Sequence, residues 1–384
     1  MQPFSGWSVA DRAPLRRSGV STPSPLHEVH SELGASFTDF AGWSMPVRYS
    51  SELAEHRAVR ESAGLFDLSH MAEIEVRGPQ AADMLDYAFV GNLATVKVGR
   101  ARYSMLCNTA GGVLDDLVTY RLEEDLYLVV ANAANAEVVA TALTDRSAGF
   151  DVEVTNRSAD YALIAVQGPS SADIVRAVSD ADLDSLRYYA SMPATVDGVD
   201  LLLARTGYTG EDGFELYCAP AQARQVWDAL SAAGQEYGLL PAGLACRDTL
   251  RLEAGMPLYG QELTEYLTPF DAGLGRLVKF EKASDFVGRD ALAARSEAEA
   301  QRILVGLAGS GRRAPRSGYP VVGPDGGEPI GEVTSGALSP TLGYPIGMAY
   351  VPVEYSDAGT ELSVDVRGKS LPVEVVALPF YRRS

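Results

Sequence analysis

The stretch EVRGPQAADML, residues 75–85, decides the fold, because it returns as AVQGPSSADIV at residues 165–175. In each copy an apolar, strand-like run precedes a Gly-Pro turn and then a helix with an aspartate in its first turn. We expect the proline in the first helical turn, since its missing N–H has no intrahelical partner there. The repeat predicts two related α+β domains in tandem, and chance similarity over so short a stretch is the alternative.

The pattern of apolar and turn residues changes after about residue 282. Beyond Arg302 short alternating apolar runs are separated by Gly, Pro and Asp, as in "RILVGLA", "PIGMAYV" and "LPVEVVAL". Such runs are typical of a small all-β module, so the sequence predicts a terminal barrel or jelly roll.

The charge balance and length of the apolar runs exclude two classes of partner. The 384 residues carry a formal net charge of −19, whereas nucleic-acid binding needs a basic face. Since no apolar run approaches ~18 residues, we expect no membrane partner either. Residues 1–25 are rich in Ser, Pro and Arg, and they lack the apolar core of a secretory signal. This predicts a disordered extension of a cytoplasmic protein; a transit peptide, and with it the mitochondrial matrix, is the alternative.

The cysteines and histidines give no sign of a disulfide framework or of a metal site. Cys107, Cys218 and Cys246 lie far apart, and there is no CxxC pair. We therefore expect a reducing compartment and no bound metal. His70 is interpreted as structural, because no Ser–His–Asp arrangement can be assigned around it.

Two adjacent carboxylates stand at the start of an apolar strand, in GGVLDDL at residues 111–117. Side chains alternate along a strand, so Asp115 and Asp116 point to opposite faces and cannot act as a dyad. Parity alone does not say which of them faces a pocket. The bland alternative is that both serve the glycine turn, as aspartates often do.

Two more motifs contain candidate ligand-binding residues. RTGYTGEDGFELY, residues 205–217, is a glycine-rich loop that exposes Tyr208 and delivers Glu215 into a strand. A carboxylate in a buried strand costs stability unless it is paired or bound to a ligand; an outward-facing Glu is the alternative. Arg247, in an otherwise apolar helix, suits a planar polar group or a carboxylate, with an internal salt bridge equally plausible.

Seven motifs in order carry a resemblance to a known family. Two of them, GGVLDDL and RTGYTGEDGFELY, are quoted above, and Arg247 lies in a third, CRDTLRLEAGMPLYGQEL. The other four are DFAGWSMPVRY, GLFDLSHM, DFVGRDAL and GEVTSGALSPTLGYPIGMAYV. From about residue 25 onward the chain resembles the T-protein of the glycine cleavage system, a folate-dependent aminomethyltransferase. "ACRD", with Cys246 where the family often has Gly or Ala, is a minor departure.

The resemblance implies a fold and a reaction. The fold is α+β, with two ferredoxin-like domains and a C-terminal β-barrel or jelly roll around a central folate pocket. In the reaction, the one-carbon unit on the dihydrolipoyl arm of H-protein passes to tetrahydrofolate, and ammonia leaves. The expected parts are a disordered extension at 1–24, a discontinuous folate-binding domain at 25–67 and 158–281, a second domain at 68–157 that carries Asp116, and a linker helix and barrel at 282–384.

The resemblance also implies roles for single residues. Asp116 matches the family's essential aspartate, which leaves Asp115 as a turn residue. A carboxylate at 116 can orient the folate amine, stabilise positive charge on the transferred carbon, or accept a proton. The proton donor for ammonia is not identified. The expected folate-binding positions are Glu215, Arg247, Tyr103, Asn132, Tyr188, Tyr208, Tyr381 and Arg382.

Other functions remain open for this fold. Relatives include folate-dependent demethylases, parts of sarcosine- or dimethylglycine-oxidising enzymes, and non-catalytic folate binders in iron–sulfur or RNA maintenance. Presence of Asp116 with Glu215 and Arg247 disfavours the non-catalytic binder, and the lack of a dinucleotide-binding domain disfavours the oxidase fusions. A carboxylate-based hydrolase using Asp116 and Glu215 is the weakest alternative, because no nucleophile or metal set supports it.

Overall fold

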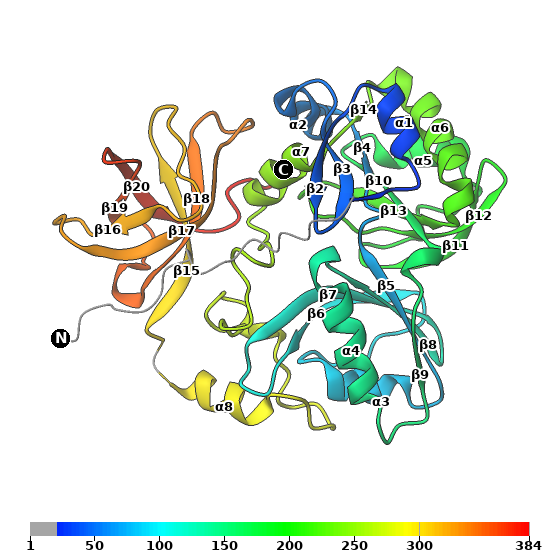
Figure 1. Cartoon of the computed structure of the whole chain (residues 1–384), viewed down its shortest axis with the longest axis horizontal. Coiled ribbons are helices and arrows are strands. Elements are labelled where there is room, and N and C mark those ends of the chain that lie inside the picture. The colour runs from blue at the N-terminus through cyan, green and yellow to red at the C-terminus, as the bar shows by residue number, and fades with distance from the viewer. Residues whose placement is uncertain (1–20, 299, 384) are drawn as a thin grey trace.

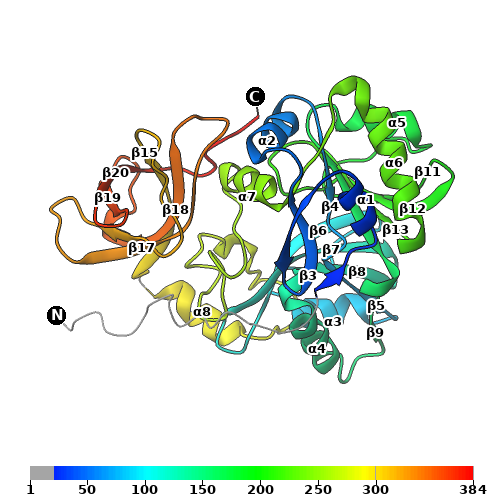
Figure 2. The ribbon, with the colours of Figure 1, turned by 45° about the horizontal axis from the view of Figure 1, so that its top comes forward.

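The structure is a computed structural model that describes residues 21–298 and 300–383. Two sheet-and-helix units lie side by side, and a barrel lies to one side of them and packs against helix α7 (Figure 1). The carboxyl end of the chain returns to helices α2 (Glu52–Glu61) and α7 (Leu244–Glu253) in both ribbon views (Figures 1 and 2). Within the described residues no helix is long and apolar enough to cross a membrane.

The first unit is built on a six-stranded sheet with the order β11-β12-β13-β10-β4-β14. Its strands are β4 (Gly64–Asp67), β10 (Ala162–Gln167), β11 (Ser191–Val196), β12 (Val199–Ala204), β13 (Gly213–Cys218) and β14 (Leu240–Pro241). Helices α5 (Ser171–Val178) and α6 (Ala223–Gly234) bury their apolar stripes on one face of this sheet, around Trp227 and Phe214.

The second unit is built on a five-stranded sheet with the order β6-β7-β8-β5-β9. Its strands are β5 (Ala72–Arg77), β6 (Arg100–Cys107), β7 (Val113–Glu123), β8 (Leu126–Ala131) and β9 (Glu153–Asn156). Helices α3 (Ala81–Ala88) and α4 (Ala136–Arg146) cover its outer face, and Tyr127 and Phe89 are buried there.

The two units share one topology, which confirms the duplication predicted from the repeat. The five strands β6-β7-β8-β5-β9 correspond in order to β11-β12-β13-β10-β4, and every neighbouring pair is antiparallel. Chance similarity would not produce the same sheet twice. The place of β9 is taken in the first unit by β4, which comes from before the second unit in the sequence.

Smaller elements complete the part of the chain before the barrel. The N-terminal sheet has the order β1-β3-β2, with β1 (Thr22–Pro23), β2 (Ser36–Phe40) and β3 (Trp43–Arg48). Helix α1 (His27–Glu32) follows β1, and α8 (Arg289–Glu297) leads to the barrel.

The C-terminal module is a closed barrel with the order β15-β18-β17-β16-β19-β20. Its strands are β15 (Arg302–Gly309), β16 (Pro320–Val322), β17 (Pro329–Leu338), β18 (Pro345–Pro352), β19 (Glu361–Asp365) and β20 (Ser370–Val376). Alternating residues such as Val364 and Val373 fill its interior. Of the two predicted forms, barrel or jelly roll, the closed barrel is confirmed.

The two sheets pack against each other through their inner faces. Tyr120 and Val130 of the second unit meet Leu163 and Tyr217 of the first in one buried cluster. The molecule therefore has four layers there, with a helix pair on each outer face. Since side chains alternate along a strand, every second residue of β7 and of β13 faces this inter-sheet layer.

The structure differs from the sequence predictions at the starts of two helices and near the N-terminus. Pro79 and Pro169 do not lie in the first helical turn; they form a tight turn ahead of it, and α3 and α5 begin two residues later. Residues 1–20 lie outside the described residues, whereas Thr22 and Pro23, inside the predicted disordered segment, pair with Trp43 and Ser44. The domain boundaries remain a proposal that the membership of the sheets supports.

Candidate active site

The hairpin β6–β7 positions the two aspartates, but neither aspartate builds its turn. Asn108 does so: its Oδ1 accepts the N–H groups of Ala110 and Gly112 at 2.9 Å. Gly112 is required there because a Cβ would lie 1.8 Å from the carbonyl oxygen of Glu265. The expectation that Asp115 serves the glycine turn is therefore wrong, since Asn108 bridges the turn and the carboxylate of Asp115 is held by Asn132 and Asn135.

Asp115 is a buried structural carboxylate. It shares parity with Leu117 and faces the outer helical layer, where it accepts the backbone N–H and the Nδ2 of Asn132 at 3.0 and 2.8 Å. The Nδ2 of Asn135 donates to it at 2.6 Å. Burial and the neighbouring charge of Asp116 raise its pKa. These three donors compensate for the cost of burying the group.

Asp116 points to the opposite face, as alternation requires. It shares parity with Tyr120 and so faces the layer between the two sheets. Tyr103 donates its hydroxyl to the carboxylate at 2.8 Å, and Asn132 donates Nδ2 at 3.1 Å. Burial raises the pKa of Asp116, although these hydrogen bonds lower it in part. The chain thus holds a carboxylate that binds protons more readily than an ordinary surface aspartate.

Glu215 faces the same layer from the opposite sheet. It shares parity with Tyr217, and its Oε2 accepts the hydroxyls of Thr206 at 2.6 Å, Tyr120 at 3.2 Å and Tyr217 at 3.3 Å. All three donors reach the same oxygen. Oε1 therefore stays available to accept N–H donors from a ligand. The alternative that Glu215 points outward is wrong.

Arg247 lies in the first turns of α7, with its guanidinium 4.7 Å from the ring centre of Tyr208. Burial lowers its pKa. Among the described residues no carboxylate lies within salt-bridge distance of it, whereas Arg251, one turn further on, pairs with Asp248 and Glu262. The alternative of an internal salt bridge therefore holds for Arg251 and not for Arg247, which has donors left for a ligand.

Electrostatic effects connect these groups into one cluster. The pKa of Tyr208 is raised by burial and by the charge of Asp116, with Arg247 acting in the opposite direction. The pKa of Tyr189 is raised by burial, by Tyr188, and by Glu215 and Asp116. Since the charges of both carboxylates act on Tyr189, and those of Asp116 and Arg247 act on Tyr208, the two sheets and α7 bring Asp116, Glu215 and Arg247 to one place.

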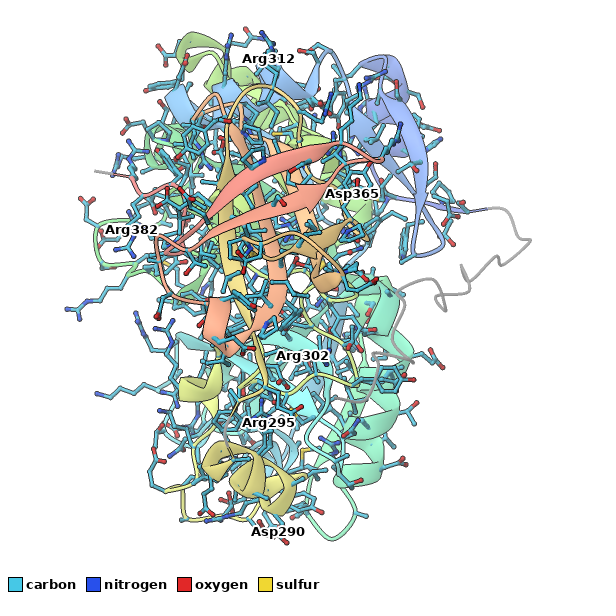
Figure 3. All side chains as sticks on the ribbon, turned by 90° about the vertical axis from the view of Figure 1, so that its left-hand side faces the viewer. Asp290, Arg295, Arg302, Arg312, Asp365 and Arg382 are labelled. Atoms are coloured by element: carbon cyan, nitrogen blue, oxygen red, sulfur yellow. The ribbon has the colours of Figure 1, made fainter. Side chains whose placement is uncertain are left out.

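The remaining predicted residues fall into two groups. Tyr188 is half exposed and packs edge-on against Tyr189, with ring centres 4.9 Å apart, so it borders the cluster. Tyr381 lies under the Arg60 guanidinium at 4.1 Å, and Arg382 is exposed on the C-terminal tail (Figure 3). The described contacts of the tail are with α2, α7 and Glu211, outside the cluster.

The sequence interpretation missed two buried carboxyl groups. Burial and the charge of Glu215 raise the pKa of Glu73 well above its usual range, and its Oε1 has no hydrogen-bond partner among the described residues. Glu262 is buried, with Oε2 held by Arg251 at 3.0 Å and Oε1 likewise unpartnered. Alternation along β5 could have indicated Glu73, and Glu262 stands in a motif already quoted.

No group of three or more potential metal-ligating side chains occurs in the described part of the chain. His70 is buried, and burial lowers its pKa to about 4, with the charge of Arg247 acting in the same direction. A neutral imidazole beside a cation fits the structural interpretation. The three cysteines are buried free thiols.

This arrangement fits a flat ligand with both donor and acceptor edges. Tyr103, Tyr189 and Tyr208 offer apolar ring faces, and Glu215 and Arg247 offer an acceptor and a donor. Asp116 adds a negative charge in a protein environment, which stabilises positive charge on a reacting atom. A pterin ring, with adjacent N–H donors and ring acceptors, matches this set of groups.

Known protein families and individual proteins match this sequence over nearly the whole chain. Residues 26–282 match the family described as GCVT N-terminal domain, and residues 302–382 match the glycine cleavage T-protein C-terminal barrel domain. The aminomethyltransferase of Streptomyces avermitilis is 63% identical over 372 residues, which are 95% of this chain and 100% of that protein. That of Streptomyces coelicolor is 64% identical over 362 residues, which are 93% of this chain and 97% of that protein.

A solved structure gives the same result for the fold. The glycine cleavage system aminomethyltransferase T from Bartonella henselae superimposes with a TM-score of 0.88 at 38% identity, covering 94% of this chain and 98% of that one. This similarity includes the two sheet units and the barrel, and so it confirms the predicted fold class. The chain belongs to the glycine cleavage T-protein family.

Proposed function

We propose that this chain is the aminomethyltransferase of a glycine cleavage system. It moves the one-carbon unit of aminomethyl-dihydrolipoyl H-protein to tetrahydrofolate and releases ammonia. Full-length relatives bearing the aminomethyltransferase name support the activity. The family is folate-dependent in general; tetrahydrofolate as acceptor, lipoylated H-protein as donor and the cytoplasm as compartment are parts of the proposal.

One observation carries the proposal. Asp116 is held by Tyr103 and Asn132 on the same inter-sheet layer as Glu215, while Arg247 has no carboxylate partner among the described residues. A protein that used these groups only for its own stability would pair the guanidinium and both oxygens of Glu215. The unused donors of Arg247 and the unused acceptor of Glu215 fit the edge of a pterin.

The residues have separate roles in this proposal. Oε1 of Glu215 accepts N–H donors of the pterin, and Arg247 donates to its acceptor edge. Tyr208, which packs against Arg247, keeps that guanidinium in place. Folate supplies the amine that accepts the carbon, and Asp116 orients this amine and stabilises positive charge near it. Tyr188, Tyr381 and Arg382 remain proposed contacts of the outer part of the ligand.

The test is ammonia release from aminomethylated H-protein, measured with and without tetrahydrofolate. We expect release that depends on tetrahydrofolate and is accompanied by stoichiometric methylenetetrahydrofolate. A parallel assay with a methylated amine donor distinguishes the folate-dependent demethylase, the main alternative. Turnover of that donor alone would replace our proposal, and folate binding without turnover of either donor would indicate a non-catalytic folate binder.

A further inference from the structure

One carboxylate oxygen beside the candidate active site has no partner in the described part of the chain. Glu262 is fully buried, and its Oε2 accepts the Nη1 of Arg251 at 3.0 Å and the backbone N–H of Leu258 at 2.9 Å. Its Oε1 is buried as well and accepts no hydrogen bond from any described residue. A buried polar atom without a partner is unusual in a folded protein, so this oxygen indicates a donor that the chain itself does not supply.

The segment that carries Glu262 covers the face of the β6–β7 hairpin to which Asp116 points. In the antiparallel register Met105 lies directly opposite Asp116, so the two side chains share that face of the sheet. Met105 and Leu263, the residue after Glu262, belong to one buried cluster. The loop at 257–267 therefore closes the hairpin end of the layer in which Asp116 lies.

The start of this loop contacts the folate-binding side of the cluster. Tyr208 donates its hydroxyl to the carbonyl oxygen of Pro257. Burial raises the pKa of Asp116, and the charge of Glu262 acts in the same direction. Burial also raises the pKa of Tyr208, and the charges of Asp116 and Glu262 add to this increase. Glu262 therefore lies within electrostatic reach of the carboxylate that acts on the transferred carbon.

The other buried carboxyl groups of this layer are less suited to bind a further donor. Asp116 already holds one donor of the chain on each oxygen, and Oε1 of Glu215 is assigned to the pterin in the proposed function. Glu73 also has an unpartnered Oε1, but burial and the charge of Glu215 raise its pKa well above the usual range. It binds a proton more readily and so attracts a cation less. Glu262 is ion-paired with Arg251 at 3.0 Å and offers a charged acceptor.

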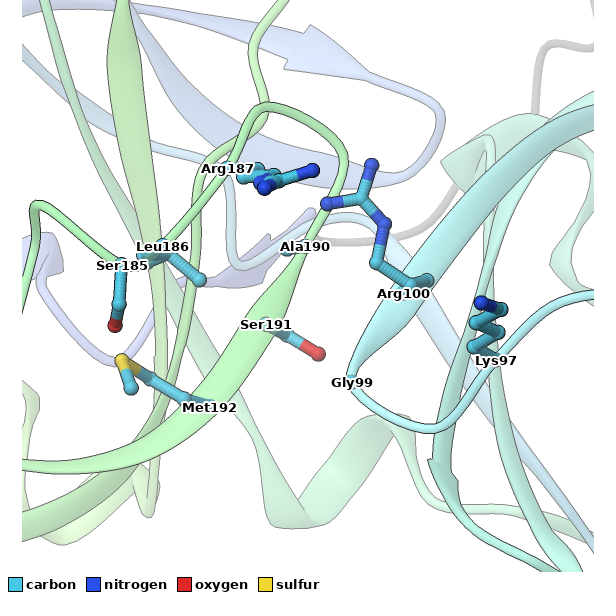
Figure 4. A pocket seen from close by; sticks show the side chains of 9 residues that line it. All are labelled: Lys97, Gly99, Arg100, Ser185, Leu186, Arg187, Ala190, Ser191 and Met192. Carbon is cyan, nitrogen blue, oxygen red and sulfur yellow. The ribbon is translucent and has the colours of Figure 1, made fainter.

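A charged carboxylate oxygen fits a cation that carries N–H donors. In the proposed function the aminomethyl donor is a small primary amine, and the product ammonium carries the same kind of donor. The cavity of about 480 Å³ between the start of β6 and the segment leading into β11 does not suit them (Figure 4). Lys97, Arg100 and Arg187 line that cavity, and like charges repel a cation.

We propose that Oε1 of Glu262 binds the amino nitrogen of the donor and, after transfer of the carbon, the ammonium product. The proposal rests on the proposed function and adds to it a separate site for the nitrogen. Asp116 acts on the carbon and the folate amine, whereas Glu262 holds the nitrogen that leaves by N–H···O hydrogen bonds. Arg251 fixes the other oxygen of the same carboxylate and so keeps it in place. The competing explanation is that Glu262 serves only as the partner of Arg251.

The experiment measures the reverse reaction, in which ammonium, methylenetetrahydrofolate and dihydrolipoyl H-protein are the substrates. An enzyme catalyses its reaction in both directions, so the KM for ammonium reports on the nitrogen site. We expect Glu262→Gln to raise this KM about 10–100-fold, in line with the loss of a charged hydrogen bond. The kcat at saturating ammonium and the KM for methylenetetrahydrofolate should stay within about threefold, because only ground-state binding of the nitrogen is weakened.

A second variant and a matched control separate binding from stability. Glu262→Asp keeps a carboxylate for Arg251 but is one methylene group shorter. It should also raise the KM for ammonium, and it tests the inference if the glutamine variant does not fold. Asp271→Asn is the control, because Asp271 is buried and loses an ion pair with Arg295 at 2.8 Å in that variant. The control should lose stability and keep the KM for ammonium of the unmodified protein.

The outcomes distinguish the nitrogen site from the proposed function. An unchanged KM for ammonium in a folded Glu262 variant, as judged by circular dichroism, would overturn the nitrogen site and leave the proposed function standing. An equal rise in the KM for methylenetetrahydrofolate would do the same, since it would show that Glu262 only supports Arg251 and the pocket around it. Absence of both the forward and the reverse reaction in the unmodified protein would instead refute the proposed function.

Discussion

Asp115 and Asp116 are adjacent in sequence and experience different environments, because alternation sends one to the helical layer and the other to the layer between the sheets. Asp115 accepts three hydrogen bonds from Asn132 and Asn135, whereas Asp116 keeps capacity toward the cluster. This difference allows each to be tested against the other.

We predict that Asp116→Asn lowers kcat for ammonia release by about 10²–10⁴-fold and leaves the dissociation constant of tetrahydrofolate within about threefold, because it removes a charge that acts on the reacting atoms. The matched variant Asp115→Asn should instead lower stability by about 1–3 kcal/mol, since its amide group would face N–H donors. Denaturant melts and turnover assays of both variants check this contrast. Unchanged turnover in the Asp116 variant would remove Asp116 from the chemistry.

The pH dependence follows from the raised pKa of Asp116. The carboxylate is the active form, so activity should fall as the pH drops through this raised pKa, nearer to neutrality than for an ordinary aspartate at about 3.9. A pH–kcat profile measures the acidic limb. In Asp116→Asn the residual activity should lack that limb; an identical limb in the variant would assign it to another group.

Glu215→Gln tests recognition separately from chemistry. The new amide keeps an acceptor but places N–H groups where the pterin donates, so we expect folate binding to weaken about 10–100-fold, in line with a lost charged hydrogen bond. Calorimetry of the variant with tetrahydrofolate gives the constant directly, and far-UV circular dichroism controls for folding. A dissociation constant equal to that of the unmodified protein would contradict the assignment.

At the scale of residues, the sequence indicates which side chains matter more clearly than it indicates where those side chains point and what they contact. Glu215 and Arg247 stood out because a carboxylate and a guanidinium in apolar runs need a reason. The partners of Asp115 could not be predicted, because Asn135 reaches it from a segment 20 residues away. The orphaned oxygens of Glu73 and Glu262 depend on packing that no local pattern reveals.

At the scale of elements, the hairpin β6–β7 depends on one glycine that leaves no room for a side chain. We predict that Gly112→Ala lowers the free energy of unfolding by about 2–4 kcal/mol, since its Cβ would overlap the Glu265 carbonyl. Gly323→Ala is the control, because its nearest neighbour lies 3.8 Å away and its φ is not positive. Equal denaturation midpoints for the two variants would show that the segment around Glu265 moves aside without cost.

Elements were predictable where their pattern was local. The repeat and the alternating barrel strands follow from periodicity and turn residues. The starts of α3 and α5 were misplaced because the Gly-Pro pairs form separate turns. Gly168 shows why: its φ is +134°, and a Cβ there would lie 2.5 Å from the carbonyl oxygen of Ser62.

At the scale of the whole molecule, a buried network fixes the barrel to the first unit. Glu253 on α7 accepts from His56 at 3.1 Å, from Arg60 at 2.8 Å and from Thr341 of the barrel at 2.8 Å. Burial alone would raise the pKa of Glu253, but the hydrogen bond and charge of His56, Ser339 and Arg60 lower it to about 2. Three segments distant in sequence thus converge on one carboxylate.

This network predicts an acid-sensitive attachment of the barrel. A carboxyl whose pKa is lower in the folded state stabilises it above the unfolded pKa, so about 3 kcal/mol should be present above pH ~4.5 and lost as the pH falls toward ~2. Glu253→Gln should remove most of this dependence and destabilise the protein by about 3–5 kcal/mol at neutral pH. Denaturant melts at several pH values measure both effects; identical pH slopes in the two proteins would contradict it.

Strand β4 belongs to the first sheet but precedes the second unit in the sequence, and this order has a consequence for folding during synthesis. Residues 72–156 supply every strand of the second sheet from one continuous stretch, so that sheet is complete as soon as this stretch has left the ribosome. In the first sheet, β4 cannot pair until its neighbour β10, which begins at Ala162, has been synthesised. The second unit can therefore fold first during translation, and the first unit is completed around it. Until β10 is available, the unpaired edges of β4 must be kept from pairing with other strands.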